Sequence, residues 1–226
     1  MNRRVLVVAA HPDDEVLGCG GTVAKLANNG CEIFTLILGT GIASRYETGQ
    51  SEKAEREIEK LRDAMYEANA IIGVKKVFTG DFPDNKFDTA ALLNLIKAVE
   101  RIKKEVRPDI IFTHYKNDLN IDHQITYKAV ITSARPLPGE TVREIYSFEV
   151  PSSTEWNYPL SFSPEVFFDI TETIELKTKA LGAYESELRD FPHPRSINGI
   201  KVNSQYRGMA AGMLYAEAFK AVRIIK

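Results

Sequence analysis

The chain has 226 residues and a net charge of -2 at pH 7, with 44% hydrophobic and 27% charged residues. This length suits one α/β domain with a sizeable core, so we expect a single domain over residues 1–226. The near-neutral charge gives no electrostatic footprint for nucleic acid, and the longest apolar runs are too short to cross a bilayer. The N-terminus lacks the pattern of a signal peptide, so we expect a cytoplasmic protein without a membrane span or a nucleic-acid partner.

Strand-like and helix-like segments alternate along the first part of the chain. Short β-branched runs are typical of buried parallel strands, whereas apolar residues at helical spacing indicate helices with one buried face. The predicted order is strand 4–10, helix 16–29, strand 31–40, helix 51–72, strand 76–78, helix 90–106, strand 109–114 and helix 122–135. This alternation predicts an α/β fold with a mostly parallel, Rossmann-like sheet flanked by helices in three layers.

The pattern changes after the proline-rich turn at residues 136–138. Strands are predicted over 141–150 and 165–170, followed by helices over 172–186 and 205–214. No linker or repeat separates this part from the rest, so we expect it to belong to the same domain.

Two polar segments follow predicted strands directly or after one loop. Residues 11–14 read His-Pro-Asp-Asp, and residues 120–123 read Asn-Ile-Asp-His. Because open parallel sheets hold ligands beyond the carboxyl ends of their strands, these two segments can converge on one crevice.

The residue types in these segments suit a catalytic zinc ion. Such an ion takes three protein ligands and leaves one position for water, so His11, Asp14 and His123 would form an open site with Asp13 left as a base. Zinc lowers the pKa of bound water from about 15.7 to about 7, which lets a neighbouring carboxylate remove its proton at neutral pH. The combination fits amide hydrolysis.

A lone histidine near a strand end is more often a hydrogen-bonded scaffold residue than a ligand. The chain has only 4 histidines, and two of them lie in acid-rich segments at strand ends, which favours the metal site. For His114, which ends the strand over 109–114, a place in the substrate pocket and a structural role stay equally open.

The same segments resemble those of the PIG-L/LmbE-like zinc de-N-acetylases. Residues 10–15 read Ala-His-Pro-Asp-Asp-Glu, and residues 122–123 give the later Asp-His pair of that family. The match covers most of the chain, and the two motifs together are highly specific.

The resemblance implies the same assignment as the ligand chemistry, with Zn²⁺ held by His11, Asp14 and His123 and with Asp13 as general base. It implies a small-molecule substrate, an N-acetylglucosamine-containing compound or a related amide. Relatives often form trimers or hexamers, so the resemblance also suggests a homo-oligomer.

One position departs from the family pattern. Many members have histidine where this chain has Asn120, and an amide can donate a hydrogen bond but cannot protonate the leaving amine as an imidazolium does. Asp13 would then carry out both proton transfers. Asp122 either orients a metal-bound histidine or caps the following helix, and both roles stay open.

Charged residues in other loops are candidates for substrate contacts. The resemblance suggests that Arg45 and Asp84 hold substrate hydroxyls or a phosphate, whereas a solvated charge and a turn-forming side chain are the structural alternatives. His193 and Arg195, with Arg207, can form a pocket for an anion, or their charges can pair with glutamates of the C-terminal part.

The sequence thus predicts a zinc-dependent hydrolase that removes an acetyl group from an N-acetylated sugar or sugar conjugate. Two alternatives remain. One is a metal-dependent amidohydrolase that acts on a non-sugar or thiol conjugate, and the other is a metal-binding or nucleotide-sugar-binding protein without turnover.

Overall fold

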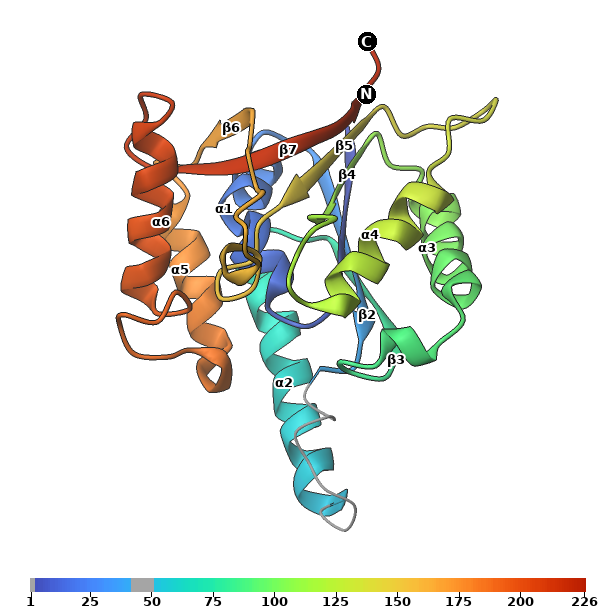
Figure 1. Cartoon of the computed structure of the whole chain (residues 1–226), viewed down its shortest axis with the longest axis horizontal. Coiled ribbons are helices and arrows are strands. Elements are labelled where there is room, and N and C mark those ends of the chain that lie inside the picture. Colours follow the sequence, from blue (N-terminus) through green and yellow to red (C-terminus); the bar gives the residue numbers. More distant parts are fainter. Residues whose placement is uncertain (1–2, 42–50) are drawn as a thin grey trace.

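A seven-stranded sheet runs through the centre of the molecule (Figure 1). The computed structural model describes residues 3–41 and 51–226, with the side chains of the second range described from residue 56 onward. The strand order is β3-β2-β1-β4-β5-β7-β6. The strands are β1 (Arg4–Ala9), β2 (Glu32–Gly39), β3 (Lys76–Phe82), β4 (Ile110–His114), β5 (Glu144–Phe148), β6 (Val166–Asp169) and β7 (Ala216–Ile224).

All pairs among β1 to β5 are parallel, and β7 runs antiparallel to both of its neighbours, β5 and β6. The sheet is therefore mostly parallel, as the alternation of segments predicted.

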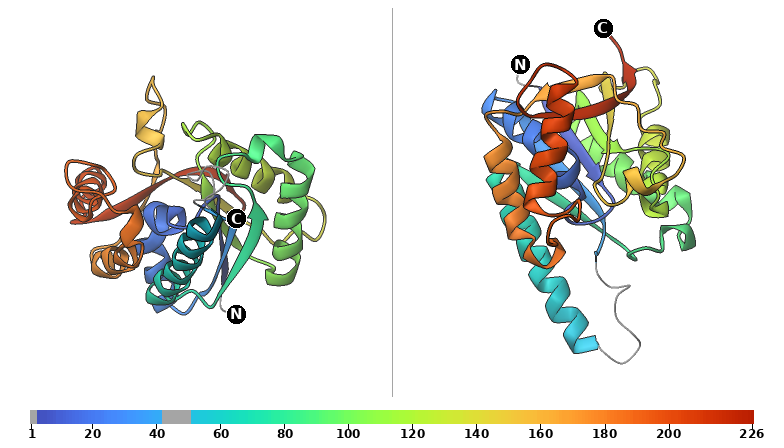
Figure 2. Two further views of the ribbon diagram at one scale, coloured as in Figure 1. Left: turned by 90° about the horizontal axis from the view of Figure 1, so that it is seen from below. Right: turned by 60° about the vertical axis from the view of Figure 1, so that its left-hand side comes forward.

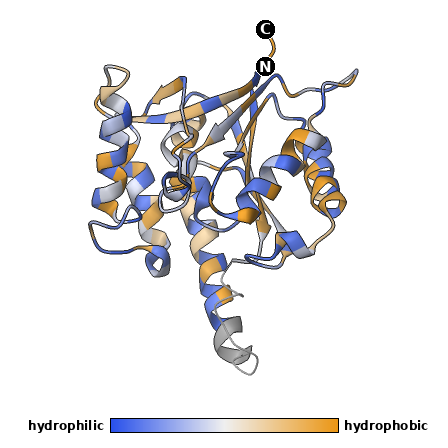
Figure 3. Ribbon diagram, in the orientation of Figure 1, coloured by the Kyte–Doolittle hydropathy of each residue, from blue (hydrophilic) through white to orange (hydrophobic). Residues whose placement is uncertain are grey.

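Helices cover both faces of this sheet (Figures 1 and 2). They are α1 (Asp14–Asn28), α2 (Ser51–Ile71), α3 (Leu92–Val106), α4 (Ile121–Ser133), α5 (Ile174–Ala183) and α6 (Ile197–Met209). Helices α3 and α4 pack on one face, and α1, α2, α5 and α6 lie on the other. Each helix carries both hydrophobic and hydrophilic residues, in keeping with one buried and one exposed side (Figure 3).

The central strand β1 shows why the sheet needs helices on both sides. Val5 and Val7 point into the core shared with α1, α2 and α5, while Leu6 and Val8 point into the core shared with α3 and α4. All four side chains are fully buried. Successive side chains of a strand face opposite ways, so a strand without polar alternation is stable only between two apolar layers.

The order of the strands places a ligand crevice at β1 and β4. From β1 the chain adds β2 and β3 on one side, then returns to add β4 on the other side of β1. Pairs from Val5 and Ile110 to Val8 and Thr113 align these two central strands. Connections diverge at this point, which leaves room for ligands beyond the carboxyl ends of both strands.

The prediction for the last third of the chain is partly wrong. The last helix covers 197–209 rather than 205–214, and residues 216–224 form strand β7. Ser196 begins this helix by accepting a hydrogen bond from the Gly199 N–H at 2.9 Å, a capping signal that the interpretation missed. The positive φ of 72° at Gly212 separates the helix from the strand.

The described helices include none with the length and hydrophobicity that a membrane span requires.

Candidate metal centre and catalytic pocket

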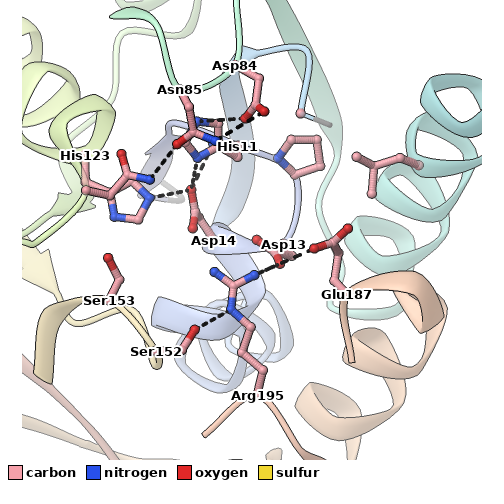
Figure 4. Close-up of a pocket in the computed structure, with 14 residues that line it drawn as sticks. His11, Asp13, Asp14, Asp84, Asn85, His123, Ser152, Ser153, Glu187 and Arg195 are labelled. Carbon is pink, nitrogen blue, oxygen red and sulfur yellow. Dashed lines mark hydrogen bonds and ion pairs between the residues drawn. The ribbon is translucent and has the colours of Figure 1, made fainter. Parts of the chain in front are cut away.

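A polar cavity opens at the carboxyl ends of β1 and β4, with a volume of about 130 Å³ (Figure 4). Its wall combines segments that are far apart in the sequence. The residues that line it are His11, Pro12, Asp13, Asp14, Gly41, Leu61, Asp84, Asn85, Asn120, His123, Ser152, Ser153, Glu187 and Arg195.

Two imidazoles and one carboxylate converge in this cavity. One ligand atom each of His11, Asp14 and His123 lies within 4.8 Å of the other two. Asp14 Oδ2 is 3.4 Å from His11 Nδ1 and 3.3 Å from His123 Nε2, and Figure 4 shows both rings turned towards this carboxylate. Two nitrogens and one oxygen that face a common point fit the donor set of a catalytic zinc ion.

The local sequence explains how the three groups meet. β1 ends at Ala9 and α1 begins at Asp14, so the first segment is a short turn across the end of the sheet. α4 begins at Ile121, which puts His123 in its first turn beyond β4. Asp14 and His123 therefore each lie in the first turn of a helix, and the buried carboxylate of Asp14 lies at the positive end of the α1 dipole.

Asp122 orients the first histidine. Its Oδ2 lies 3.0 Å from His11 Nε2, and its Oδ1 accepts the Phe87 N–H at 2.9 Å. The cap of α4 is Asn120 instead, whose Oδ1 accepts the Asp122 N–H at 2.8 Å. Asp122 could have oriented a histidine or capped the helix, and its contacts are those of a residue that orients His11.

Asp118 holds the second histidine in the same way, and the sequence interpretation missed it. Its Oδ1 lies 3.0 Å from His123 Nδ1, and the hydroxyls of Ser153 and Thr154 donate to its two oxygens. Asp118 is fully buried. The available signal was an acid in the polar loop that leads into α4, five residues before His123.

The acidic surroundings favour positive charge on both imidazoles. Burial lowers the pKa of His11, but the hydrogen bond to Asp122 and the contact with Asp14 outweigh it and raise this pKa to about 10. Burial likewise opposes a charge on His123, whereas Asp14 and Asp118 raise its pKa to about 9. Desolvation alone would disfavour cations here, so the neighbouring carboxylates are what stabilise positive charge at the cluster.

Asp13 lies beside the cluster in an uncommon backbone conformation. Its φ is 99°, and its carboxyl group is buried with Oδ2 accepting a hydrogen bond from Arg195 Nη1 at 2.9 Å. Burial raises the pKa of Asp13 to about 8, against the opposing effect of the Arg195 guanidinium.

Glu15 is a further buried acid that the interpretation did not single out. Oε2 accepts the Asp13 N–H at 3.1 Å, and Oε1 accepts from Asn69 Nδ2 at 2.9 Å and from the Tyr184 hydroxyl at 2.5 Å. Three donors thus converge on one carboxylate directly beneath the turn that carries Asp13.

The opposite wall contains Asp84, Asn85 and Asn120. Asp84 Oδ1 is 3.4 Å from His11 Nε2, and Asn120 Nδ2 donates to Asn85 Oδ1 at 3.1 Å. Asp84 therefore lines the cavity, and its contact with substrate stays a prediction. Arg45, the other residue predicted to contact substrate, lies outside the described residues.

Two histidines lie elsewhere. His114 is fully buried below the cluster, where its Nε2 accepts the Ala10 N–H at 2.8 Å, and it does not line the cavity. Its position corresponds to the structural alternative. His193 lies outside the cavity wall, where its Nδ1 accepts the Arg195 N–H at 3.1 Å.

Arg195 and Arg207 both lie against acids of the chain. Arg195 Nη1 is 2.9 Å from Asp13 Oδ2 and 3.8 Å from Glu187 Oε2, whereas Arg207 makes two hydrogen bonds to the Glu149 carboxylate, of 2.8 and 2.6 Å. Of the two alternatives for these arginines, the geometry is that of pairing with acids, with Glu187 as the expected kind of partner for Arg195 and Glu149 as an unexpected one for Arg207.

The sheet is mostly parallel, and a His/Asp/His cluster that could hold a metal ion lies at the carboxyl ends of β1 and β4. This combination defines the class of the protein as an α/β enzyme with a candidate metal site. The chain belongs to the PIG-L family, since the model of the GlcNAc-PI de-N-acetylase family matches residues 6–134. The match contains both motifs of the cluster.

Known proteins similar to this chain extend the likeness beyond that region. An uncharacterized deacetylase, YaiS of Escherichia coli, is 30% identical over 188 residues, 80% of this chain and 90% of that protein. A probable N-acetyl-alpha-D-glucosaminyl L-malate deacetylase 2 of Bacillus cereus is 30% identical over 190 residues, 83% of this chain and 84% of its own. The N,N'-diacetylchitobiose deacetylase of Pyrococcus horikoshii shares the fold with a TM-score of 0.77 at 22% identity, covering 98% of this chain and 84% of that one.

Proposed function

We propose that this protein is a zinc-dependent hydrolase that removes the acetyl group from an N-acetylated sugar or sugar conjugate of the N-acetylglucosamine type. The observation that carries the proposal is the convergence of His11, Asp14 and His123 on one point of a cavity that also holds the carboxyl group of Asp13. Relatives described as deacetylases of N-acetylglucosaminyl compounds support the substrate class.

His11, Asp14 and His123 are the proposed zinc ligands. The three donors leave room for a ligand from solvent, and Asp122 and Asp118 hold the outer ring nitrogens of the two histidines. When bound there, Zn²⁺ supplies a Lewis acid that polarises the amide carbonyl and acidifies water.

Asp13 is the proposed general base. The hydrogen bond from Arg195 fixes one oxygen of its carboxyl group at the cavity wall. Asp13 takes the proton of the attacking water and passes it to the nitrogen of the leaving amine. The second transfer falls to the same group because Asn120, at the opposite wall, has no titratable side chain.

Asn120, Asp84 and Arg195 are proposed to position the substrate. The amide of Asn120 donates towards the carbonyl oxygen, and Asp84 accepts from a sugar hydroxyl beside the reacting group. Arg45 is proposed to hold a hydroxyl or a phosphate of the substrate, and this assignment comes from the family resemblance alone.

Acetate release tests the proposal directly. The zinc-loaded protein should release acetate and a free amine from at least one of a panel of free, phosphorylated, lipid-linked and nucleotide-linked N-acetyl sugars. Release at background level from the whole panel, with zinc bound, would contradict a deacetylase and favour a binding protein.

The Asp13→Asn variant tests the base. We expect it to keep one zinc ion per chain and to lose at least about a hundredfold in kcat, as expected when a general base is removed. Asp63→Asn, at an exposed position on α2, is the matched control and should retain wild-type kcat. Full activity in Asp13→Asn would show that another group takes the proton.

A further inference from the structure

As the described residues form it, the cavity is too small to enclose a whole sugar conjugate. Its volume of about 130 Å³ is well below the roughly 300–1,000 Å³ of pockets that bury complete ligands. It can receive the acetamido end of a substrate, so the rest of a larger conjugate has to extend across the rim.

An aromatic pair lies next to the part of the wall that Ser153 and Arg195 provide. The ring centroids of Trp156 and His193 are 5.7 Å apart at an interplanar angle of 86°. Trp156 follows the cavity residue Ser153 by three positions, and His193 precedes the cavity residue Arg195 by two. Contacts therefore lead from Trp156 through His193 and Arg195 to the proposed base.

The turn that carries Trp156 is firmly anchored. The hydroxyls of Ser153 and Thr154 donate to Asp118, the acid that also holds His123. On the other side, Asn157 Nδ2 donates to the Asn117 carbonyl at 2.9 Å. The main chain on both sides of Trp156 is thus held close to the His/Asp/His cluster.

Trp156 nevertheless presents much of its surface to solvent, with 44% of the residue exposed. Figure 2 (left) shows the segment after β5 projecting from the body of the molecule. A large, half-exposed aromatic side chain on an anchored turn next to a pocket is the kind of anchor that ligands use.

His193 adds a polar group of defined direction. The Arg195 N–H donates to Nδ1, so the neutral ring carries its proton on Nε2. That nitrogen is on the far side of the ring from the Arg195 backbone and can donate to a hydroxyl group. An apolar face next to one such donor matches a pyranose ring, which offers C–H groups on one face and hydroxyls at its edge.

We propose that Trp156 and His193 form a second-ring subsite, which binds the ring attached to the reacting N-acetyl sugar. The inference rests on the proposed function and deepens it, because it gives the enzyme a preference for substrates of at least two rings over a single N-acetyl sugar. The indole stacks on the second ring, and His193 Nε2 donates to one of its hydroxyls.

Fluorescence gives a direct binding test, because Trp156 is the single tryptophan of the chain. The zinc-loaded Asp13→Asn protein is titrated with N,N'-diacetylchitobiose and, separately, with N-acetylglucosamine. We expect the disaccharide to change the emission of Trp156 in a saturable way, and the monosaccharide to leave it almost unchanged. The same small response to both sugars would overturn the subsite.

Kinetics provide the second test. In an otherwise wild-type protein, Trp156→Ala should raise KM for the disaccharide about tenfold, the usual scale for loss of an aromatic anchor, with kcat and the KM for the monosaccharide preserved. Trp156→Phe keeps an aromatic face and should restore most of the affinity. Leu93→Ala, which truncates an exposed apolar residue on α3, is the control and should change neither KM.

The outcomes separate this inference from the proposed function. Saturable binding of the disaccharide to the Asp13→Asn protein, with no acetate release by the zinc-loaded wild-type protein, supports the subsite and contradicts the deacetylase. An active enzyme in which Trp156→Ala affects both sugars equally overturns the subsite alone. A third outcome also overturns the subsite. If neither sugar changes the emission of Trp156 but dilution of the protein does, a second copy of the chain covers the indole.

Discussion

Asp13 has a backbone conformation that the chain must hold in place. Its φ of 99° lies in a region that costs a residue other than glycine about 1–3 kcal/mol. The Asp13 N–H is bonded to Glu15, and its carboxyl group is bonded to Arg195. The proposed base is thus fixed at its main chain and at its side chain by different partners.

Glu15→Gln should lower kcat without a change in KM or in zinc content. The Glu15 carboxylate accepts from three donors, and an amide in its place turns one acceptor into a donor that faces another donor. A small displacement of Asp13 then reduces kcat by about tenfold to a hundredfold. Steady-state kinetics with metal analysis of the same samples measure this.

Tyr184→Phe is the matched control. It removes one donor to Glu15 but leaves both carboxylate oxygens, and so the acceptor of the Asp13 N–H, in place. We expect a clearly smaller loss of kcat. Equal losses in the two variants would mean that Glu15 acts through packing of the core rather than through Asp13.

The sequence could identify the residues that converge on the cavity but not all of their supports. His11, Asp14 and His123 lie in two motifs at strand ends, and topology alone brings those ends together. Asp118 and Glu15 are single acids without a diagnostic spacing. Their roles depend on which donors the fold turns towards them, and that information is tertiary.

At the level of elements, helix α1 is interrupted in the middle. Cys19 has φ -149°, which breaks the run of helical backbone. Glu217 of β7 accepts the N–H groups of Gly21 and Thr22 at 3.0 and 2.7 Å, as a cap does for a new helix. The carboxylate of Glu217, in the last strand, therefore caps the N-terminus of the second half of α1.

Lys177 of α5 completes this junction. Its Nζ donates to the Leu17 carbonyl at 2.8 Å and to Glu217 at 2.6 Å, and both charged side chains are almost fully buried. The pair thus joins α1, α5 and β7 at one point.

Glu217→Ala should destabilise the protein by about 3–5 kcal/mol, the usual cost of leaving a buried charge without its partner. The change also removes the acceptor of two N–H groups in α1. Chemical denaturation followed by circular dichroism measures the free energy of unfolding.

Glu175→Ala provides the comparison for Glu217→Ala. It breaks the exposed ion pair between Glu175 and Lys201, so it should leave the unfolding free energy almost unchanged. The doubly apolar variant Lys177→Met with Glu217→Leu should recover part of the loss, because it leaves no unpaired charge. A loss in Glu217→Ala as small as that of Glu175→Ala would show that the junction does not stabilise the fold.

The elements that the sequence predicted best are those with a clear period. The first four strands alternate with helices and match the structure to within a few residues. α6 was misplaced because this helix contains Gly199 and Gly208, and β7 was missed because it is antiparallel and inserted between two earlier strands. A local pattern does not show such an insertion.

For the molecule as a whole, the site depends on the complete chain. The matched family region ends at residue 134, yet Ser152, Glu187 and Arg195 contribute to the cavity wall. Figure 4 shows Arg195 reaching the proposed base from the segment before α6. The expected location in the cytoplasm, the trimer or hexamer and the absence of a nucleic-acid partner stay predictions.

Removal of the metal should abolish activity while the fold persists. Both cores are built from apolar residues on the two faces of the sheet, and the cluster lies outside them. Dialysis against a chelator should therefore leave the circular dichroism spectrum unchanged. Removal of zinc should lower the free energy of unfolding only by the contribution of zinc binding to the folded state. That contribution is about 2.7 kcal/mol at a zinc concentration of 100 times Kd.

Adding Zn²⁺ back should restore acetate release, whereas Mg²⁺ and Ca²⁺, which prefer oxygen ligands, should not. Activity that survives chelation would contradict the proposed zinc dependence. Unfolding on chelation would instead make the ion a structural component.

The two histidines of the cluster lie in segments that follow adjacent parallel strands, His11 in the turn after β1 and His123 in the first turn of α4 after β4, and this ties metal loading to correct folding. A slip of β4 against β1 by two residues would move His123 by about 6.6 Å relative to His11, more than shared coordination of one ion tolerates. A chain with misaligned central strands would capture no zinc. The ratio of zinc to protein in a purified sample would then give the fraction of molecules in which β1 and β4 have the correct register.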